Sequence, residues 1–489
     1  MDIKEKITAQ RAEAWREELR RKMKNKDRTS IPRVKMNELD PEYRSRCNEE
    51  VNLGLTAEQA MNEAQRCIDC PSPSCMEGCP VNIHIPTFIK NIERGAFAEA
   101  AKVLKEANAL PAVCGRVCPQ EKQCECMCIH LKMNKEPVAI GYLERFAADY
   151  ERESGNMSVP EIAAKNGFKI AVVGSGPAGL SFAGDMAKMG YDVTVFEALH
   201  EIGGVLKYGI PEFRLPNHIV DVEIETLRKM GVQFVLNSIV GKTLGYDDLM
   251  QEGYKGIFVA SGAGLPNFMD IPGENLIGVM SSNEYLTRVN LMNAARDDSD
   301  TPVLKGKNVA VIGGGNTAMD SVRTARRMGA ERAMIIYRRS EEEMPARIEE
   351  VKHAKEEGVE FMTLHNPVEY LGDANGHVTR MRVQQMALGE PDASGRRRPV
   401  PIEGAILEMD ADEVIVSVGV SPNPLIPKAF EGLEVSRKGT IIVNEDTMRS
   451  SLDVVYAGGD IVRGGATVIL AMGDGRKAAA AMNEQLSTH

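Results

Sequence analysis

Hydrophobic and polar residues follow a helical period in the first third of the chain. Apolar side chains recur there at spacings of three and four residues, which predicts amphipathic helices. Thr56 is suited to cap one of these helices, and another pattern breaks at Gly95. The segments concerned are 5–25, 56–67, 85–108 and 139–154. We therefore expect residues 1–165 to form a helical domain.

The first of these segments, 5–25, is charged along its whole length. A helix with so few apolar positions usually lies on the surface, with water on most of its faces. We expect such a solvated helix here, with a helix that docks a partner as the alternative.

From Phe168 onward the pattern becomes that of alternating strands and helices. A short apolar strand, a glycine turn, a helix and a second strand follow one another over 168–198, and the same order returns over 307–339. This repeat predicts two βαβ units, and a βαβ unit with a glycine turn is suited to a nucleotide. The polar segment 283–302 is expected to connect the two units.

The first unit carries a complete dinucleotide fingerprint, GSGPAG. Gly174 allows the tight turn, Gly176 lets the backbone approach a pyrophosphate, and Gly179 lets helix and strand pack closely. The second strand ends in Glu197, an acid that can accept hydrogen bonds from ribose hydroxyls. The alternative is a purely structural glycine turn. The expected site comprises Gly174, Gly176, Pro177, Ala178, Gly179 and Glu197.

The second unit has the turn GGGNTA, in which alanine is an accepted third member. Its second strand ends in Arg338 and Arg339, where the first unit has an acid. An acid repels a 2′-phosphate, whereas arginine binds one through charge-assisted and often bidentate hydrogen bonds. This unit is therefore expected to bind NADPH, with a plain surface arginine pair as the alternative. The expected site comprises Gly313, Gly314, Gly315, Asn316, Thr317, Ala318, Arg338 and Arg339.

The simplest assignment is FAD in the first unit and NADPH in the second. Near the C-terminus, Asp460 follows a strand and Gly459, where it can reach a ribityl hydroxyl. A helix starting near Ala466 can direct its positive end at the flavin. The turn over 203–216 is expected to lie along the FAD, or else to be a structural loop. Its expected contacts are Gly204, Val205 and Leu206.

This C-terminal contribution makes the FAD-binding domain discontinuous. We expect an α/β fold in which residues 166–300 and 415–489 form the FAD-binding domain, and residues 301–414 form an inserted NADPH-binding domain. Both domains are expected to be Rossmann-like.

Net charge and the length of apolar runs exclude two classes of protein. A formal net charge of −11 argues against a general nucleic-acid binder. No apolar run approaches the roughly 18 residues of a membrane-spanning helix, and the N-terminus lacks the apolar core of a signal peptide. We expect a cytoplasmic protein that binds neither nucleic acid nor a membrane.

The ten cysteines are confined to the N-terminal region. Nine lie between Cys67 and Cys128, and the tenth is Cys47. In a reducing cytoplasm, clustered cysteines are more often metal ligands than disulfides. A flavin-dependent disulfide reductase needs a redox cysteine pair in its FAD domain, and no cysteine follows position 128. The thiol chemistry therefore belongs to the helical domain.

The spacing of these cysteines favours iron–sulfur clusters. The groups read C-x2-C-x4-C-x3-C-P and C-x3-C-P-x4-C-x-C-x-C. Bacterial ferredoxin runs have three close thiols and a fourth, before proline, that binds another cluster. Zinc sites more often have two C-x2-C pairs. We expect two [4Fe–4S] clusters in the helical domain, with zinc or plain structural thiols as alternatives.

Several motifs together resemble one family over nearly the whole chain. They are the two cysteine groups, GRVCPQEKQCE, GSGPAGL, GGVLKYGIPEFRLP, GGGNTAMD, EEMPARIEEV and AGGD. They are similar to the small (β) subunit family of NADPH-dependent glutamate synthase. That family includes the flavin subunit of NADH-dependent reduced ferredoxin:NADP oxidoreductase and the N-terminal half of dihydropyrimidine dehydrogenase. The resemblance implies a helical two-cluster domain followed by tandem FAD and NADPH domains.

The resemblance also implies a crossed set of cluster ligands. One cluster takes Cys67, Cys70, Cys75 and Cys128, and the other takes Cys79, Cys118, Cys124 and a side-chain oxygen of Glu144. Cys114 and Cys126 have no ligand role in this scheme, although Cys126 could replace a ligand locally. The alternative for Glu144 is a plain charge on the surface of a helix.

The implied function is electron input for glutamate synthase. Electrons pass from NADPH to FAD and the [4Fe–4S] clusters, and then to a partner that makes glutamate from glutamine and 2-oxoglutarate. The chain has no length to spare for that chemistry, so the glutamate synthase large subunit is the expected partner in a hetero-oligomer. Hydride transfer requires no acid–base group, and we therefore expect no catalytic residue of that kind.

A second branch of the resemblance stays open. The stretch EEEMPARIEEV is at least as similar to the stand-alone and ferredoxin-linked members as to the small subunit itself. The alternative function is therefore the flavin subunit of an NADH-dependent reduced ferredoxin:NADP oxidoreductase, with a ferredoxin-linked flavoprotein subunit as partner. Sulfide dehydrogenase activity is a further possibility in this branch.

Overall fold

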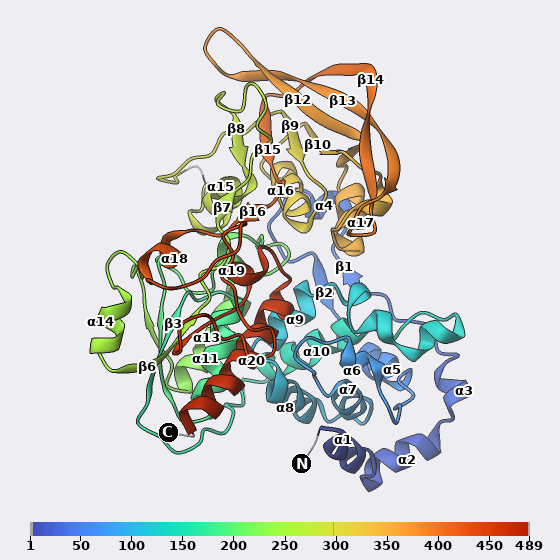
Figure 1. Ribbon diagram of the computed structural model, residues 1–489. Helices are drawn as coiled ribbons and strands as arrows, with labels where there is room; N and C mark the ends of the chain where they lie inside the picture. Colours follow the sequence, from blue (N-terminus) through green and yellow to red (C-terminus); the bar gives the residue numbers. More distant parts are fainter. Residues whose placement is uncertain (1–2, 156, 297, 488–489) are drawn as a thin grey trace.

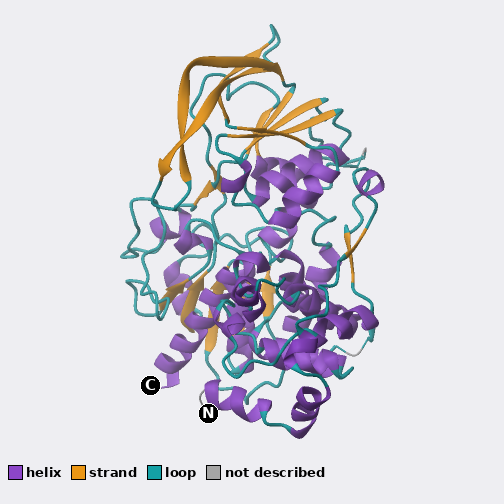
Figure 2. Cartoon of the chain, turned by 90° about the vertical axis from the view of Figure 1, so that its right-hand side faces the viewer, coloured by secondary structure: helices purple, strands orange, loops and turns teal. Residues whose placement is uncertain are grey.

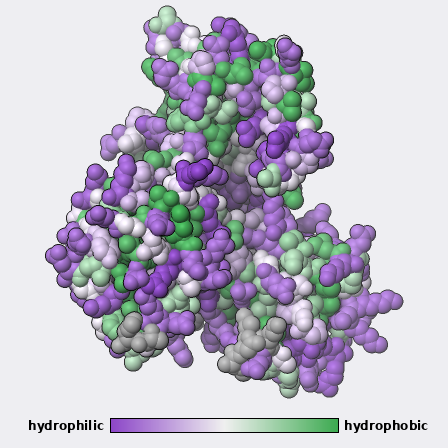
Figure 3. All heavy atoms as spheres, viewed as in Figure 1, coloured by the Kyte–Doolittle hydropathy of each residue, from purple (hydrophilic) through white to green (hydrophobic). Residues whose placement is uncertain are grey.

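The computed structural model describes residues 3–155, 157–296 and 298–487. The N-terminal helices lie beside a lower α/β unit that contains the C-terminal helix, and a second α/β unit lies above them (Figure 1). Figure 3 shows the surface hollowed between the upper unit and the lower two. The α/β class and the helical N-terminal domain expected from the sequence are confirmed.

The helical pattern of the first third corresponds to a cluster of short helices. Thr56 caps α5 in a capping box, because its side chain accepts from the backbone N–H of Gln59 and the Gln59 side chain accepts from Thr56 N. Gly95, with φ of +78°, separates α7 from α8. The elements are β1 Asn37–Glu38, α4 Pro41–Arg44, β2 Asn52–Gly54, α5 Ala57–Gln65, α6 Ser74–Glu77, α7 Ile85–Glu93, α8 Phe97–Ala107, α9 Pro111–Val117, η1 Gln120–Lys122, η2 Glu125–Met127, η3 Ile129–Met133 and α10 Ile140–Glu153.

The charged segment 5–25 is less solvated than its composition predicts. It forms α1 (Ile3–Arg11), α2 (Ala14–Lys22) and the start of α3 (Asn25–Arg28), in place of one continuous helix. Arg16 is only 1% exposed, because its guanidinium pairs with the buried carboxylate of Asp69. One face of α2 is therefore fixed to the cysteine loop by an ion pair that apolar periodicity does not reveal.

The lower α/β unit is built on a five-stranded parallel sheet in the order β17-β6-β3-β4-β5. Its strands are β3 Lys169–Val173, β4 Asp192–Phe196, β5 Gln233–Val235, β6 Tyr254–Val259 and β17 Val455–Ala457. Helix α11 (Pro177–Lys188) follows the first glycine turn, and the C-terminal α20 (Val468–Ser487) packs against it. Close packing requires Gly475, since a Cβ there would lie 2.5 Å from the Ala178 carbonyl oxygen. The other helices are α12 Val205–Tyr208, α13 Asn217–Lys229, α14 Tyr246–Gln251, α18 Leu425–Ala429 and α19 Asp460–Arg463.

The upper unit has a second parallel sheet, in the order β11-β10-β9-β15-β8. Helix α16 (Asn316–Arg327) follows the second glycine turn, and α17 (Ile348–Glu356) packs beside it. The strands are β8 Val279–Ser281, β9 Asn308–Ile312, β10 Arg332–Tyr337, β11 Glu360–Thr363 and β15 Glu413–Val416.

Two short paired strands connect the two units. Strand β8 already belongs to the upper sheet, and the segment expected to be a connector contains α15 (Ser282–Leu286) and the π-helix η4 (Thr287–Leu291). The chain enters the upper unit at β7 (Leu265–Pro266) and leaves it at β16 (Val420–Ser421), and these strands pair antiparallel. We propose boundaries near these strands, in place of those drawn at 300 and 415.

A long antiparallel ribbon projects from the upper unit (Figure 2). It consists of β12 (His365–Gly372), β13 (Val378–Pro391) and β14 (Arg397–Asp410), in that order. One face of β13 packs on the upper sheet through Val378, Met381 and Val383, which are buried. The sequence pattern did not predict this ribbon, because most of β14 is exposed and lacks a continuous apolar alternation.

Buried ion pairs join the N-terminal domain to the upper unit. The Glu357 carboxylate accepts from Arg323 and Arg327 of α16 and from Arg44 of the N-terminal domain. Arg347 donates to the carbonyl oxygen of Arg116. Because these arginines are buried with their partners, their pairing fixes how the two parts sit.

Candidate cofactor sites

One cavity of about 1150 Å³ joins the two glycine fingerprints. It is lined by Gly176 of the lower unit and Gly315 of the upper unit, together with Asp460 from the C-terminal segment. Segments far apart in the sequence therefore meet around one space. Such a position, beyond the carboxyl ends of parallel strands, is where open α/β sheets bind ligands.

The three glycines of the first fingerprint occupy three different environments. Gly174 has φ of +100°, and a Cβ there would lie 2.5 Å from the Ala260 carbonyl oxygen. A Cβ on Gly179 would lie 2.1 Å from the Gly174 carbonyl oxygen. A Cβ on Gly176 would meet no neighbouring atom within 4 Å, and this residue faces the cavity. Gly174 and Gly179 thus allow the turn and the packing, and Gly176 keeps space free beside the start of α11 for a pyrophosphate.

Glu197 lies at the end of β4 as expected, and its carboxylate is held in place. One oxygen accepts from both the backbone N–H and the hydroxyl of Ser175, and the other accepts from Leu199 N. The residue is 6% exposed and lines the cavity. Carboxylate oxygens have further lone pairs, so this geometry leaves acceptor capacity for ribose hydroxyls.

The remaining expected flavin contacts divide into two groups. Pro177, Ala178, Gly204, Val205, Gly459 and Asp460 line the cavity, whereas Leu206 is fully buried in the core. Leu206 therefore supports the turn from behind and does not face the FAD space. Burial raises the pKa of Asp460. Helix α20 begins at Val468, two residues after the start expected from the sequence, and Val468 lines the same cavity.

The second fingerprint contributes only part of its turn to the cavity. Gly315, Asn316 and Thr317 line it. Gly313 has φ of +147°, and a Cβ on Gly314 would lie 2.7 Å from the Tyr337 ring, so these two glycines serve the turn itself. Ala318 is fully buried at the start of α16.

The structure separates the two arginines that end β10. Arg339 is 6% exposed, donates to the Arg397 carbonyl oxygen and pairs with Asp392 at 2.6 Å. Arg338 is exposed, and no hydrogen bond or ion pair of its side chain occurs in the described part of the chain. Neither arginine lines the central cavity. Arg339 therefore attaches the ribbon, and Arg338 is the guanidinium that remains available for a 2′-phosphate.

Sequence reasoning missed an ion pair that bridges the two units inside the cavity. Arg214 of the lower unit donates to both carboxylate oxygens of Asp320, at 3.2 and 2.9 Å, on α16 of the upper unit. Burial raises the pKa of Asp320 to about 6, although Arg214 favours the charged form. Both residues lie within motifs noted above, GGVLKYGIPEFRLP and GGGNTAMD, but only the fold shows that they meet.

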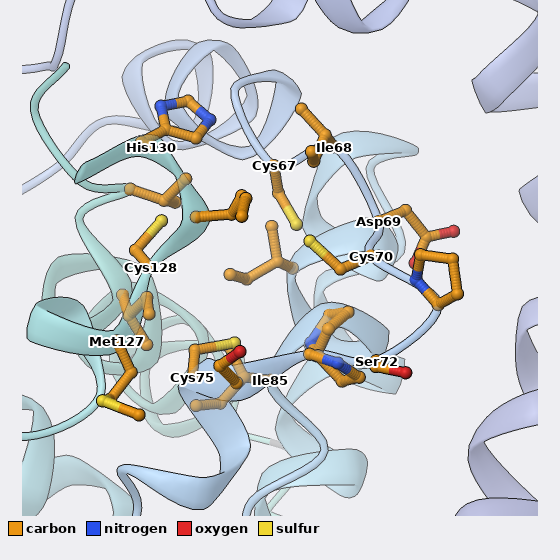
Figure 4. A pocket seen from close by; sticks show the side chains of 18 of the residues that line it. Cys67, Ile68, Asp69, Cys70, Ser72, Cys75, Ile85, Met127, Cys128 and His130 are labelled. Atoms are coloured by element: carbon orange, nitrogen blue, oxygen red, sulfur yellow. The ribbon is translucent and has the colours of Figure 1, made fainter. Parts of the chain in front are cut away.

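A separate cavity of about 520 Å³ gathers the first cysteine set. Figure 4 shows the side chains of Cys67, Cys70, Cys75 and Cys128 around it. The first three come from the loop after α5 and the start of α6, and Cys128 follows η2. The structure thus brings together the four cysteines that the family resemblance assigns to one cluster.

The wide spacing of the sulfurs favours an iron–sulfur cluster over a single zinc ion. A tetrahedral zinc site with bonds of about 2.3 Å would bring its sulfurs to within about 3.8 Å of one another. Among the described residues, no three cysteine sulfurs lie within 4.8 Å of one another. The sulfurs surround a space larger than one ion, as the cysteines of a cubane cluster do.

The thiols of both cysteine sets have raised pKa values. Burial raises the pKa of Cys70 to about 12 and that of Cys79 to about 11. The pKa values of Cys75, Cys118 and Cys124 are also raised. Thiols of this kind ionise only beside a strong positive charge, such as a bound metal centre provides.

The second set lies around Glu144. Cys79, Cys118 and Cys124 are buried, and Glu144 on α10 is 5% exposed. The charge of Glu144 contributes to the raised pKa of each of the three thiols, so the four groups are neighbours. Burial raises the pKa of Glu144 itself to about 8. Glu144 is therefore a buried group and not a charge on the surface of a helix.

The second cysteine set adjoins the flavin cavity. Val117 and Pro119, on either side of Cys118, line that cavity. The Gln123 side chain donates to the Thr467 hydroxyl at 3.3 Å, just before α20. The N-terminal domain therefore reaches the cavity on the side of the second cysteine set.

One further group of possible ligands is a salt-bridge cluster. Oxygen atoms of Glu38 and Glu349 and a nitrogen of His353 lie within 4.8 Å of one another. Arg44 and Lys352 pair with Glu38, and Arg347 pairs with Glu349. These cations already balance both carboxylates, which disfavours a metal ion.

In the part of the chain that the structure describes, none of the helices has the length and apolar character to span a membrane.

The fold and the two cavities define an NADPH-dependent flavin oxidoreductase that also carries an iron–sulfur centre. Two family models match the chain. Residues 44–156 match "dihydropyrimidine dehydrogenase domain II, 4Fe-4S cluster", and residues 168–475 match "pyridine nucleotide-disulphide oxidoreductase". The second model covers more than half of the chain. No cysteine occurs within 168–475, so a redox cysteine pair is absent from that part of the sequence.

The chain belongs to the pyridine nucleotide-disulphide oxidoreductase family, in the group of the glutamate synthase small chains. It is 36% identical to the glutamate synthase [NADPH] small chain of Azospirillum brasilense, over 88% of this chain and 90% of that protein. It is also 36% identical to the NADPH-Fe(3+) oxidoreductase subunit beta of Geobacter sulfurreducens, over 85% of this chain and 64% of that protein. FprA from Mycobacterium tuberculosis, solved with NADPH, shares the fold at a TM-score of 0.55 and 21% identity, over 66% of this chain and 85% of FprA.

Proposed function

We propose that the chain is the electron-input subunit of an NADPH-dependent glutamate synthase. The observation that carries the proposal is the single cavity that joins both fingerprints and adjoins the second cysteine set. The similarity to a glutamate synthase small chain over nine tenths of that protein supports the specific assignment. FAD supplies the conversion of a two-electron hydride donor into single electrons that iron–sulfur clusters carry.

The chain's own residues bind and orient the two dinucleotides. Gly176 leaves space for the FAD pyrophosphate at the start of α11, and Glu197 accepts from its ribose. Gly315 leaves space for the NADPH pyrophosphate at the start of α16, and Arg338 binds the 2′-phosphate. The Arg214–Asp320 ion pair holds the two units together inside the shared cavity.

We propose two [4Fe–4S] clusters held by the crossed ligand sets. Cys67, Cys70, Cys75 and Cys128 hold one, and Cys79, Cys118, Cys124 and Glu144 hold the other. The second set adjoins the flavin cavity, so a cluster held there would be the nearer acceptor for electrons from the flavin. The first set lies beside α2 and α6, around a separate cavity, and a cluster held there would pass electrons on toward the partner.

The proposed partner is the glutamate synthase large subunit, in a hetero-oligomer in the cytoplasm. The names of the relatives support a multisubunit assembly, since they are small or beta subunits. The Geobacter relative favours a second candidate, in which the same electron path serves another acceptor, such as ferric iron or a ferredoxin-linked flavoprotein subunit.

Purification of the tagged chain from its own cells tests the assignment. We expect a large subunit to co-purify, and the complex to oxidise NADPH only when glutamine and 2-oxoglutarate are both present. If the captured complex instead reduces ferredoxin or ferric iron with NADPH and forms no glutamate, the second candidate replaces the first.

A further inference from the structure

Asn108 lies between the second cysteine set and the flavin unit, and it is completely buried. It follows α8 directly, at the point where the chain turns toward α9. Its side-chain nitrogen donates to a carboxylate oxygen of Glu144 at 2.8 Å. In the described part of the chain, this is the hydrogen bond that the structure gives to the Glu144 side chain.

The other end of the Asn108 amide is fixed by two donors. Its side-chain oxygen accepts from the backbone N–H of Leu110 at 2.9 Å and from the thiol of Cys114 at 3.7 Å. Because a backbone N–H and a thiol both donate to this oxygen, the amide NH₂ must face Glu144. The contacts of the side-chain oxygen thus fix the orientation of Asn108, and this orientation directs its NH₂ group at the Glu144 carboxylate.

Cys114 extends this arrangement to the flavin unit. Its sulfur lies 3.6 Å from the sulfur of Met472 on α20, and it is a neighbour of Cys118. The thiol therefore occupies the space between the second cysteine set and the helix that begins at the flavin cavity. Cys114 thus helps to orient Asn108, although the crossed ligand scheme gives it no ligand role.

We propose that Asn108 is a positioning residue for the second cluster: its amide NH₂ holds one oxygen of Glu144 so that the carboxylate can bind iron. The proposal rests on the proposed function, and on Glu144 as the oxygen ligand. A neutral donor on one carboxylate oxygen lowers the cost of burying the charge, and it withdraws electron density from the ligand.

Two consequences follow for the metal centre. Hydrogen bonds to ligands are among the groups that set iron–sulfur potentials, and removal of a donor leaves the carboxylate a stronger electron donor. The midpoint potential of the second cluster therefore shifts to a more negative value when the amide NH₂ is lost. The first cluster has separate ligands and keeps its potential.

The decisive variant is Asn108→Asp in the full-length holoprotein. Aspartate has the same shape and still accepts from Leu110 and Cys114, but it has no NH₂ and places a second acid beside Glu144. We expect loss of up to one cluster's iron and sulfide, or a changed EPR spectrum and a more negative potential for the second cluster alone. Asn91→Asp is the matched control, because Asn91 is a buried asparagine whose NH₂ donates to the Thr87 carbonyl oxygen in α7.

Wild-type iron content, EPR spectrum and potential in Asn108→Asp would overturn the proposal, and would show that Asn108 only caps the Leu110 N–H. If this variant does not fold, Asn108→Ser decides: its short hydroxyl still reaches the Leu110 N–H but not Glu144, so the same spectral change is expected. A wild-type spectrum in that variant also contradicts the proposal. Failure of the proposed function is distinguishable, because the unmodified protein would then lack the second cluster's signal or would not be reduced by NADPH.

Discussion

At the residue scale, the same substitution at two glycines of one fingerprint should affect different properties, FAD binding at one and stability at the other. Gly176→Ala places a methyl group in open space beside the cavity, so the fold should persist while FAD binding weakens at least tenfold. Gly179→Ala places it 2.1 Å from a carbonyl oxygen, so stability should fall by about 1–3 kcal/mol. Thermal unfolding of the FAD-free proteins and FAD titration separate the two. Equal loss of stability in both variants would contradict the assignment of Gly176 to the pyrophosphate.

The two arginines at the end of β10 should also differ. Arg338→Ala removes the available guanidinium, so the Kd for NADPH should rise about tenfold or more, with little change for NADH. Arg339→Ala breaks the pairing with Asp392 and should mainly lower the melting temperature. Titration followed by flavin fluorescence or by calorimetry measures the Kd values, and thermal unfolding measures the melting temperatures. An equal loss of affinity for NADPH and for NADH in Arg338→Ala would show that Arg338 does not bind the 2′-phosphate.

Glu144 gives a third prediction at this scale. Glu144→Ala should lose or alter one cluster, because it removes the only oxygen in a set with three buried thiols. Iron analysis and EPR of the reduced protein provide the measurement. Unchanged iron content and an unchanged spectrum would exclude Glu144 as a ligand.

Much of the site could be predicted at the residue scale, because fingerprints and cysteine spacings are local. Gly176 and Glu197 occupy the expected places for that reason. The functional difference between Arg338 and Arg339 could not be predicted, because it depends on Asp392 in a ribbon far along the chain. The Arg214–Asp320 pair was missed for the same reason, since its members are about a hundred residues apart.

At the scale of elements, α17 is held to the rest of the molecule by charge. The carboxylate of Glu357, at its C-terminal end, accepts from three arginines. Burial by itself would raise the pKa of Glu357, but Arg323 and Arg327 outweigh it and hold the pKa at about 2, below the ordinary value of 4.5. The stabilisation is therefore complete above pH 4.5 and is lost as the pH falls toward 2, by on the order of 3 kcal/mol.

Melting temperatures of the wild type and of Glu357→Gln between pH 7 and pH 3 test this account. The variant should be less stable at pH 7, and the difference from wild type should shrink as the pH falls. Glu331→Gln is the control, because its pair with Lys307 is largely exposed and contributes little. A constant difference between Glu357→Gln and wild type would contradict the role of its charge.

The elements themselves were predicted unevenly. The two βαβ units and the helix break at Gly95 follow from periodicity and glycine placement. The ribbon β12–β14 was missed, since strand β14 is solvated and carries little apolar alternation. The charged helices at the N-terminus were expected in water, but the buried partner of Arg16 is an aspartate in the cysteine loop, which no periodicity indicates.

At the scale of the whole molecule, three parts converge on one electron path. The upper unit presents Gly315 and the lower unit presents Gly176 to one cavity, and the N-terminal domain contributes Val117 and Pro119 beside Cys118. The sequence indicated which parts exist. Their meeting point depends on long-range packing, such as the approach of Gly473 on α20 to Pro80, where a Cβ would lie 2.9 Å from the Pro80 carbonyl oxygen.

The central claim is that NADPH electrons cross this cavity into the iron–sulfur domain of the chain itself. An anaerobic titration of the purified holoprotein with NADPH, followed by visible absorbance and EPR, tests it most directly. The account predicts that NADPH alone bleaches the flavin and produces the EPR signal of reduced iron–sulfur clusters, without any partner subunit. A flavin that NADPH reduces while the clusters stay oxidised, or a protein that NADPH does not reduce at all, would contradict it.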